Sequence, residues 1–528
     1  MSPHAGIRNS VGAGLLLAAV ACNSGSGEGG RSQVRSSPSP GCQVLSVSPF
    51  PPGLDWLPGT AGLAIAATFE PPSVQVLDAS GEAPRPAAGI PTLFVPDDSD
   101  GDGVAEGSGA VPDFPEIDDL VVVPPALVDT GLGLITASGY EEVIFFRPAA
   151  AALASVEVSV AASFAPTDFR RLPVPGTAAL RTAVSSDACI RPAAPIDSNG
   201  DDYAAGFPAS VFCDPQVAGS FYARFTSGAT VAAGRLFVSM SNLGSGADTS
   251  APRFLPGAVL VYDLDLAALP PRVAPNPDVP FIETTDFNPS QVTRVEVGGV
   301  EWVLVTLSGA IGIEADDPGT PEVEQGTLAL SEGAIEILDP ESLEHLGSLP
   351  LGLGAPTFDR LAVDPTGRVA VVGSSLAREL YVIDLAGLAS DPVDLVGAVV
   401  YDADAALEFP ALAGGPSLAS CAPLVGGIAW NDAGDRLFTT ERCDGSLSEF
   451  DVSLREGPDG RIDPSSFRWI STERLVSPLR ADTLGDVRDP GRLRIRPGRP
   501  GIDYAGPDAL FLNSQPDGQA CAVRLESL

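Results

Sequence analysis

Acidic side chains at alternate positions mark one short stretch of this sequence as a candidate cation site. In "PDDSDGDG", Asp98, Asp100 and Asp102 precede Gly103. A hard cation such as calcium takes about 6 to 8 oxygen ligands, and this spacing turns successive carboxylates toward one ion. The sequence therefore predicts a calcium loop here. The alternative is a solvated acidic loop, which 68 acidic residues make common in this chain.

The stretch resembles the DxDxDG core of EF-hand and thrombospondin type 3 loops. Those loops close with a bidentate glutamate at the twelfth position, where this chain has Gly109, so the resemblance implies weak binding. A second stretch, "IDSNGDD", repeats the alternation. Its oxygen-bearing residues are Asp197, Asn199 and Asp201, followed by Asp202 in place of the glycine.

Groups that carry nucleophilic or proton-transfer chemistry are scarce. Of two histidines, only His345 lies outside the N-terminal leader, in "DPESLEHLG". This segment predicts an outer hairpin, so we expect an exposed turn residue rather than a catalytic base. All 30 basic residues are arginine, which excludes a Schiff-base lysine and a phosphate-loop lysine. We identify no catalytic residue.

The N-terminus has the pattern of a secretory leader. An apolar run from Val11 to Ala21 ends at Cys22 and is too short for a stable membrane span. The small residues before Cys22 resemble a bacterial lipobox, which implies a signal peptide over 1–21 and lipidation of Cys22. Asn23 then favours the outer membrane, and 22–40 forms a lipidated, flexible Gly/Ser/Pro tether. The alternative is an ordinary signal cleaved nearby.

Two segments align without a gap and define a repeat. They are "LAVDPTGRVAVVGSSLARELYVIDL" from Leu361 and "IAWNDAGDRLFTTERCDGSLSEFDV" from Ile428. Each reads as strand, glycine turn, strand, loop and a third strand ending in aspartate. Looser copies begin at Gly62, Asp118, Gly234, Val300 and Asp508.

The pattern of "DPTGR", an apolar strand and "YVIDL" resembles the YVTN-type β-propeller repeat. The resemblance implies an all-β fold for 41–528, a β-propeller of about seven four-stranded blades. An array of β-sandwiches is the rival architecture. The repeat indicates architecture and not activity.

Five long irregular segments interrupt the repeats. By our strand assignment each joins the second strand to the third or one blade to the next, so all should emerge on one face of the propeller. Long loops grouped on a rigid scaffold favour a binding face, although surface loops also tolerate length without function. The segments are Pro96 to Pro115, Ala165 to Gly219, Ser241 to Gly257, Ser308 to Ser331 and Tyr401 to Pro423.

The seven cysteines leave six if Cys22 is lipidated, an even number that predicts three disulfides in an oxidising compartment. Six cysteines allow many pairings, and the repeat layout favours one of them. Joining the first and last segments would close the ring, with a stabilisation of about 4 to 5 kcal/mol in the chain-entropy model. The predicted pairs are Cys42 with Cys521, Cys189 with Cys213, and Cys421 with Cys443.

The net charge of −38 repels nucleic acid and anionic head groups and favours cations or basic partners. Together these features predict a lipid-anchored envelope β-propeller that acts as a non-catalytic binding scaffold. Its expected partners are an envelope protein or a saccharide on the loop-rich face. The alternative is a hydrolase of lactonase type with a carboxylate or metal site in the propeller channel, an activity found among proteins with similar repeats.

Overall fold

A computed structural model of the chain describes the strands and their short turns. The described residues are 42–46, 53–57, 62–68, 73–88, 93–94, 117–123, 132–137, 142–146, 170–173, 226–240, 243–245, 252–254, 256–265, 272–279, 281–309, 311–313, 327–329, 333–352, 361–374, 379–390, 393, 407–408, 425–441, 445–458, 460–475, 490–496, 509–513, 518–523 and 525.

Within these residues the strands form seven antiparallel sheets of four or five strands, which we call blades 1 to 7. Blade 1 comprises β2 (Gly53–Trp56), β3 (Leu63–Thr68), β4 (Ser73–Asp78), β5 (Arg85–Pro86) and β6 (Leu93–Phe94). Blade 2 comprises β7 (Ile117–Val123), β8 (Leu132–Ala137), β9 (Glu142–Phe146) and β10 (Arg170–Pro173). Blade 3 comprises β11 (Thr226–Ala232), β12 (Arg235–Met240), β15 (Pro256–Asp265), β16 (Arg272–Pro275) and β17 (Phe281–Phe287).

The remaining four sheets follow in chain order. Blade 4 comprises β18 (Pro289–Val297), β19 (Val300–Leu307), β22 (Gly333–Leu338) and β23 (His345–Gly352). Blade 5 comprises β24 (Ala362–Val363), β25 (Val369–Gly373), β26 (Glu379–Asp384) and β27 (Leu407–Glu408). Blade 6 comprises β28 (Val425–Trp430), β29 (Arg436–Glu441), β30 (Ser446–Val452) and β31 (Phe467–Arg474). Blade 7 comprises β32 (Pro490–Ile495), β33 (Ala509–Asn513), β34 (Gly518–Val523) and β1 (Cys42–Ser46).

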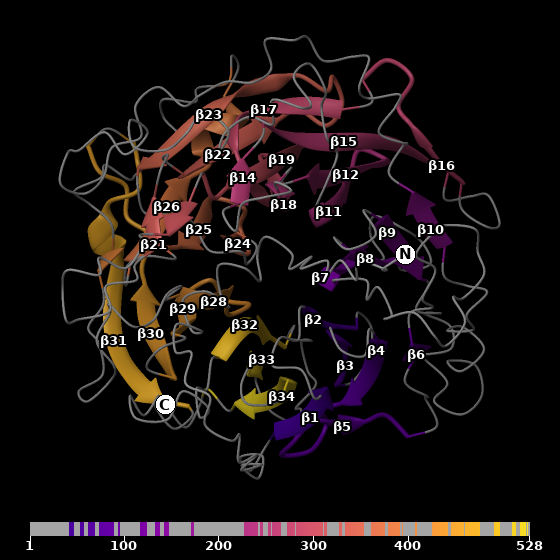
Figure 1. The fold of residues 1–528 in the computed structure, drawn as a ribbon. Helices are drawn as coiled ribbons and strands as arrows, with labels where there is room; N and C mark the ends of the chain where they lie inside the picture. The colour runs from indigo at the N-terminus through magenta and orange to yellow at the C-terminus, as the bar shows by residue number, and fades with distance from the viewer. Residues whose placement is uncertain are drawn as a thin grey trace, which may run out of the picture.

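The blades are arranged around a common centre, as Figure 1 shows. The first strand of each blade lies innermost, and neighbouring first strands touch, as in the pairs β2 with β7, β11 with β18, and β28 with β32. Separate β-sandwiches would not place these strands in a ring. The fold is therefore a β-propeller, as the repeat pattern predicts.

Hydrophobic cores lie between neighbouring blades, and β25 of blade 5 shows that a central strand is buried on both faces. In β25, Ala370 and Val372 pack with residues of blade 4, whereas Val369 and Val371 pack with residues of blade 6. This explains why "VAVVG" is apolar at every position instead of alternating with polar residues. Each blade thus depends on its two neighbours for burial.

The ring closes where the two ends of the chain meet. β1 pairs with β34 as the outermost strand of blade 7, and Cys42 lies directly opposite Cys521. The two cysteines form a disulfide across 479 residues of sequence separation. The structure therefore contains the predicted ring-closing bond.

Two of the segments predicted as irregular also hold outer strands. The span Ala165 to Gly219 contains β10, which pairs with β9, and Tyr401 to Pro423 contains β27, which pairs with β26. The prediction is wrong for these few residues because an outermost strand pairs along one edge only and needs little apolar character. Over the described ranges, no helix has the length and hydropathy to cross a bilayer.

Candidate functional site

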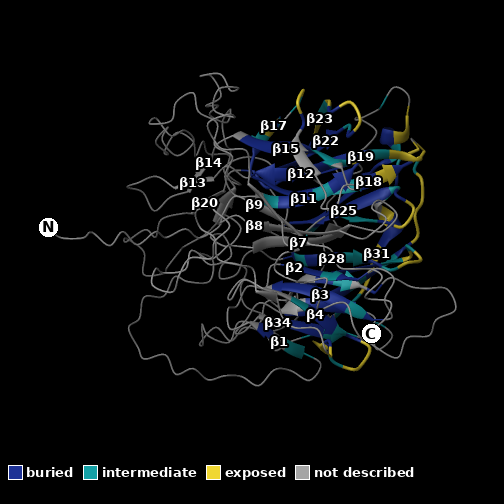
Figure 2. Ribbon diagram, turned by 90° about the vertical axis from the view of Figure 1, so that its right-hand side faces the viewer, coloured by how far each residue is buried: buried dark blue, intermediate teal, exposed yellow. Residues whose placement is uncertain are grey.

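Connections of different length divide the propeller into two faces. The connection from β12 to β15 carries the hairpin β13 (Leu243–Ser245) and β14 (Pro252–Phe254), and that from β19 to β22 carries β20 (Ile311–Ile313) and β21 (Thr327–Ala329). The turn from β11 to β12 and the connection from β12 to β15 lie at opposite ends of β12, so the hairpins emerge on the side opposite the exposed turns that Figure 2 draws in yellow. We call these sides the loop face and the turn face.

Most of the predicted site residues lie outside the described residues. They are the calcium candidates Asp98, Asp100, Asp102, Asp197, Asn199 and Asp201, the lipidation candidate Cys22, and the cysteines Cys189, Cys213, Cys421 and Cys443. Where the structure does describe the chain, no three His, Cys, Asp or Glu side chains come together as a metal-binding group. Calcium binding and the two inner disulfides thus stay predictions.

Bulges near the loop face shape the innermost strands. In blade 3 the bulged backbone N–H of Gly228 donates to Ser239 Oγ at 2.9 Å, and in blade 6 that of Gly427 donates to Thr440 Oγ1 at 2.8 Å. A bulge frees backbone groups from the ladder, and the hydroxyl of the second strand takes the place of the lost partner. The loop-face ends of β11 and β28 are thereby held in a fixed shape.

The corresponding bulge in blade 4 lacks this hydrogen bond from the backbone to a hydroxyl group of the second strand. Thr306 lies opposite Gln291 beside the bulge, yet Thr306 Oγ1, Gln291 Oε1 and both polar side-chain atoms of Asn288 have no hydrogen-bond partner in the described chain. All three side chains are at least 98% buried. An unpaired buried polar group costs about 1–3 kcal/mol, so these groups lower the stability of blade 4 at its loop-face end.

His345 belongs to a second polar cluster. It is the first residue of β23, and its Nε2 lies 3.5 Å from Glu336 Oε2. Glu336 is fully buried, and its other oxygen accepts hydrogen bonds from the backbone N–H of Thr285 and from Thr285 Oγ1, the latter at 2.5 Å. The prediction of an exposed turn residue is wrong. His345 begins a strand, and its side chain is only 24% exposed because it packs beside the carboxylate of Glu336.

The chemistry of this pair follows from its charges. Contact with Glu336 raises the pKa of His345, and the charge of that carboxylate adds to the rise, while partial burial opposes it. A histidine with a raised pKa is protonated over more of the neutral range and is a poorer general base. The pair is therefore suited to an ion pair rather than to proton abstraction.

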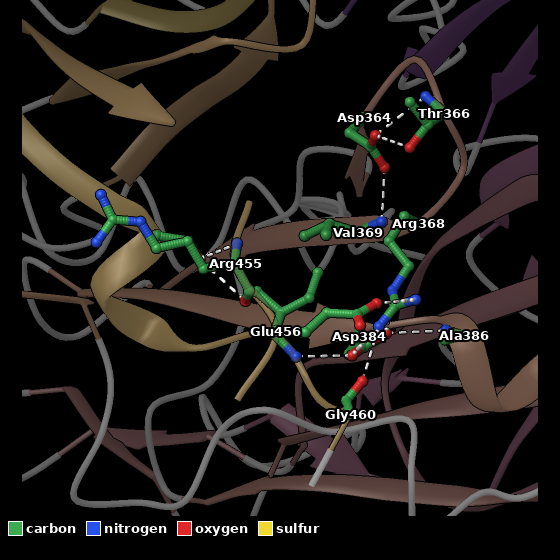
Figure 3. Close-up of polar contacts among 11 residues, drawn as sticks. Asp364, Thr366, Arg368, Val369, Asp384, Ala386, Arg455, Glu456 and Gly460 are labelled. Atoms are coloured by element: carbon green, nitrogen blue, oxygen red, sulfur yellow. Dashed lines mark hydrogen bonds and ion pairs between the residues drawn. The ribbon is translucent and has the colours of Figure 1, made fainter. Parts of the chain in front are cut away.

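The turn face carries a network that joins blades 5 and 6 (Figure 3). Arg368 donates to Asp384 Oδ2 at 2.9 Å and to the backbone carbonyl of Gly460 at 3.2 Å, and it lies 3.4 Å from Glu456. Asp384 Oδ2 also accepts the backbone N–H of Ile462 at 3.0 Å. Arg368 and Asp384 of blade 5 thus both bind the connection between β30 and β31 of blade 6.

The same pairing recurs in other blades. Arg235 lies 3.5 Å from Asp263 and donates to the carbonyl of Pro340 in blade 4, and Arg436 pairs with Asp451 in blade 6. The sequence signal is an arginine shortly after the turn glycine and an aspartate at the end of the third strand. These arginine and aspartate side chains bond to one another and to the backbone within the propeller, so on the turn face they stabilise the fold.

No protein-family model and no curated protein matches the chain. Similar solved structures include the β-propeller domain of Myceliophteria thermophila Cps50 (Swd1), at 10% identity and a TM-score of 0.43, covering 91% of this chain and 96% of that one. Kuenenia stuttgartiensis hydrazine synthase has 10% identity, a TM-score of 0.47 and coverage of 94% and 99%. A streptogramin B lyase has 10% identity, a TM-score of 0.40 and coverage of 91% and 95%.

Proposed function

We propose that this protein is a lipid-anchored envelope scaffold whose loop face binds another envelope protein or a saccharide without catalysis. The observation that carries the proposal is the difference between the two faces. On the turn face, Arg235 and Arg368 each bond to the next blade. The loop face instead carries the hairpins β13–β14 and β20–β21.

The composition supports the same partners. A net charge of −38 disfavours nucleic acid and anionic lipid surfaces and speeds association with basic protein surfaces. Neutral amide and hydroxyl side chains on a loop face would complement the hydroxyl groups of a saccharide, since each can donate or accept. Loops held on a rigid ring present such groups in a constant arrangement.

A binding experiment with face-specific variants tests the proposal. The secreted body is used as bait against envelope extracts and envelope polysaccharide, with residues 243–254 replaced by an Asn-Gly turn in one variant. The control is Val300→Ser on the turn face, where Val300 is 48% exposed. We expect the hairpin variant to lose the ligand and Val300→Ser to retain it. Equal binding by both variants, or equal loss, would contradict a ligand site on the loop face.

Anchoring is tested separately. Metabolic labelling with a fatty acid should mark the wild-type protein and leave Cys22→Ser unlabelled, and the variant should appear in the soluble fraction. Equal labelling of the two proteins would show that Cys22 is not the lipidated residue. The binding result does not depend on this outcome, because the bait lacks the anchor.

A further inference from the structure

We propose that Glu336, Thr285 and His345 form a pH-dependent clamp that fastens β17 of blade 3 to blade 4, tight when His345 is protonated and weakened when it is neutral. The clamp is independent of the ligand proposed above. β17 packs against β22, and both hydrogen bonds from Thr285 end on one oxygen of Glu336. The other oxygen faces the imidazole of His345 at 3.5 Å.

The burial of Glu336 explains why the histidine matters. The carboxylate is fully buried at a strand position between Ile335 and Ile337, which face a hydrophobic core. An ionised carboxylate removed from water needs a counter-charge as well as hydrogen bonds. His345 supplies that charge only when protonated. When His345 is neutral, the buried carboxylate of Glu336 lacks this counter-charge, so the closed arrangement that holds β17 against β22 is less stable.

The neighbouring charges do not replace His345. β17 carries Glu283 and Asp286, the turn between β22 and β23 carries Asp339, Glu341 and Glu344, and β19 carries Glu301, which pairs with Arg294 of β18. Arg235 of β12 reaches this turn, but its guanidinium donates to the backbone carbonyls of Pro340 and Glu341. The surroundings are therefore mainly acidic, which keeps His345 as the positive partner of Glu336.

The direction of the pH effect follows from the raised pKa of His345. A group whose pKa in the folded state exceeds its unfolded value of 6.5 binds its proton more tightly when folded. Its stabilisation is complete below that value and disappears as the pH rises through the folded pKa. The clamp is thus tight in mildly acidic medium and weakens in alkaline medium.

The first test compares melting temperatures across pH. Between about pH 5.5 and pH 8.5, the wild-type Tm should fall by roughly 1 to 3 °C more than that of His345→Gln. Glu344→Gln is the matched control beside His345, because Glu344 is exposed and the pKa of His345 is raised by Glu336, and this variant should retain the wild-type difference. Parallel curves for wild type and His345→Gln would overturn the proposal.

The second test needs only the wild-type protein. The amide proton of Thr285 donates to Glu336, so its hydrogen exchange, corrected for intrinsic rate, should speed up several-fold relative to other β17 amides as the pH rises. The imidazole resonance of His345 should titrate above pH 6.5. Constant protection of Thr285, or titration at or below 6.5, would overturn the clamp even if the variants fail to fold.

Discussion

The space around three turn glycines shows how closely neighbouring blades approach one another on the turn face. Gly234, Gly434 and Gly367 each lie between the first and second strands of a blade, with φ of +71°, +71° and +72°. A side chain added at Gly234 meets nothing within 4 Å, whereas at Gly434 it meets Pro365 Cδ at 3.2 Å. At Gly367 it would overlap the backbone carbonyl oxygen of Glu296 in blade 4.

Alanine at the three positions should therefore cost stability in the order 234, 434, 367. The left-handed backbone costs an alanine about 1 to 2 kcal/mol at each site. At Gly434 the proline ring must move by a few tenths of an ångström, which adds less than about 1 kcal/mol. At Gly367 a backbone carbonyl blocks the methyl group, so blades 4 and 5 must shift apart, which adds about 1 to 3 kcal/mol.

Urea denaturation measures the series, with Gly234→Ala as the internal control for backbone strain. The midpoint should fall furthest for Gly367→Ala while the slope stays constant, since the same surface unfolds in each variant. A Gly367→Ala variant no less stable than Gly234→Ala would refute the close packing of this turn against blade 4. Equal losses at all three sites would mean that backbone conformation alone sets the cost.

Three further predictions concern the ring closure, acid stability and calcium. Replacing both Cys42 and Cys521 by alanine should lower the free energy of unfolding by about 3 to 5 kcal/mol in chemical denaturation, because the bond spans 479 residues; an unchanged midpoint would contradict a constraining role. Partial burial raises the pKa of Glu301, but hydrogen bonds from Arg294 and the backbone of Ala233 outweigh it and lower the pKa. The stabilisation by Glu301 is therefore present above the ordinary pKa of 4.5 and is lost as the pH falls through the lowered pKa. Glu301→Gln should flatten the acid limb of a pH–stability curve, and an unaltered limb would count against this ion pair. Millimolar calcium should stabilise the wild type by about 1 kcal/mol and leave Asp100→Asn with Asp102→Asn unaffected in calorimetry, and equal responses would identify the loop as a solvated acidic turn.

The repeat was predictable because its signals are local. An apolar strand, a glycine with positive φ and a terminal aspartate recur in sequence, and β24 to β26 and β28 to β30 lie where these signals predict. The outer strands β10 and β27 gave no such signal, and each pairs along one edge only, at the end of its sheet. Their pairing depends on the neighbouring strand and not on their own composition.

The polar clusters were harder to predict. Glu336 stands in "GAIEIL", where a charged residue in an apolar strand is the only local indication of a buried partner. The partner of its carboxylate, Thr285, is 51 residues away and on another blade, so only the folded ring brings the two together. The partial burial of His345 follows from its own contact with Glu336. Sequence spacing thus predicts the strands better than it predicts the side chains that meet between them.

The disulfide between Cys42 and Cys521 also makes the body a covalently closed circle. A protease that cuts one peptide bond anywhere between these residues opens the circle but releases no fragment, because the two new ends remain joined through the bridge. Each nicked molecule keeps its full mass until it is reduced. A single cut in any of the long connections between these two cysteines therefore leaves all parts of the propeller covalently joined.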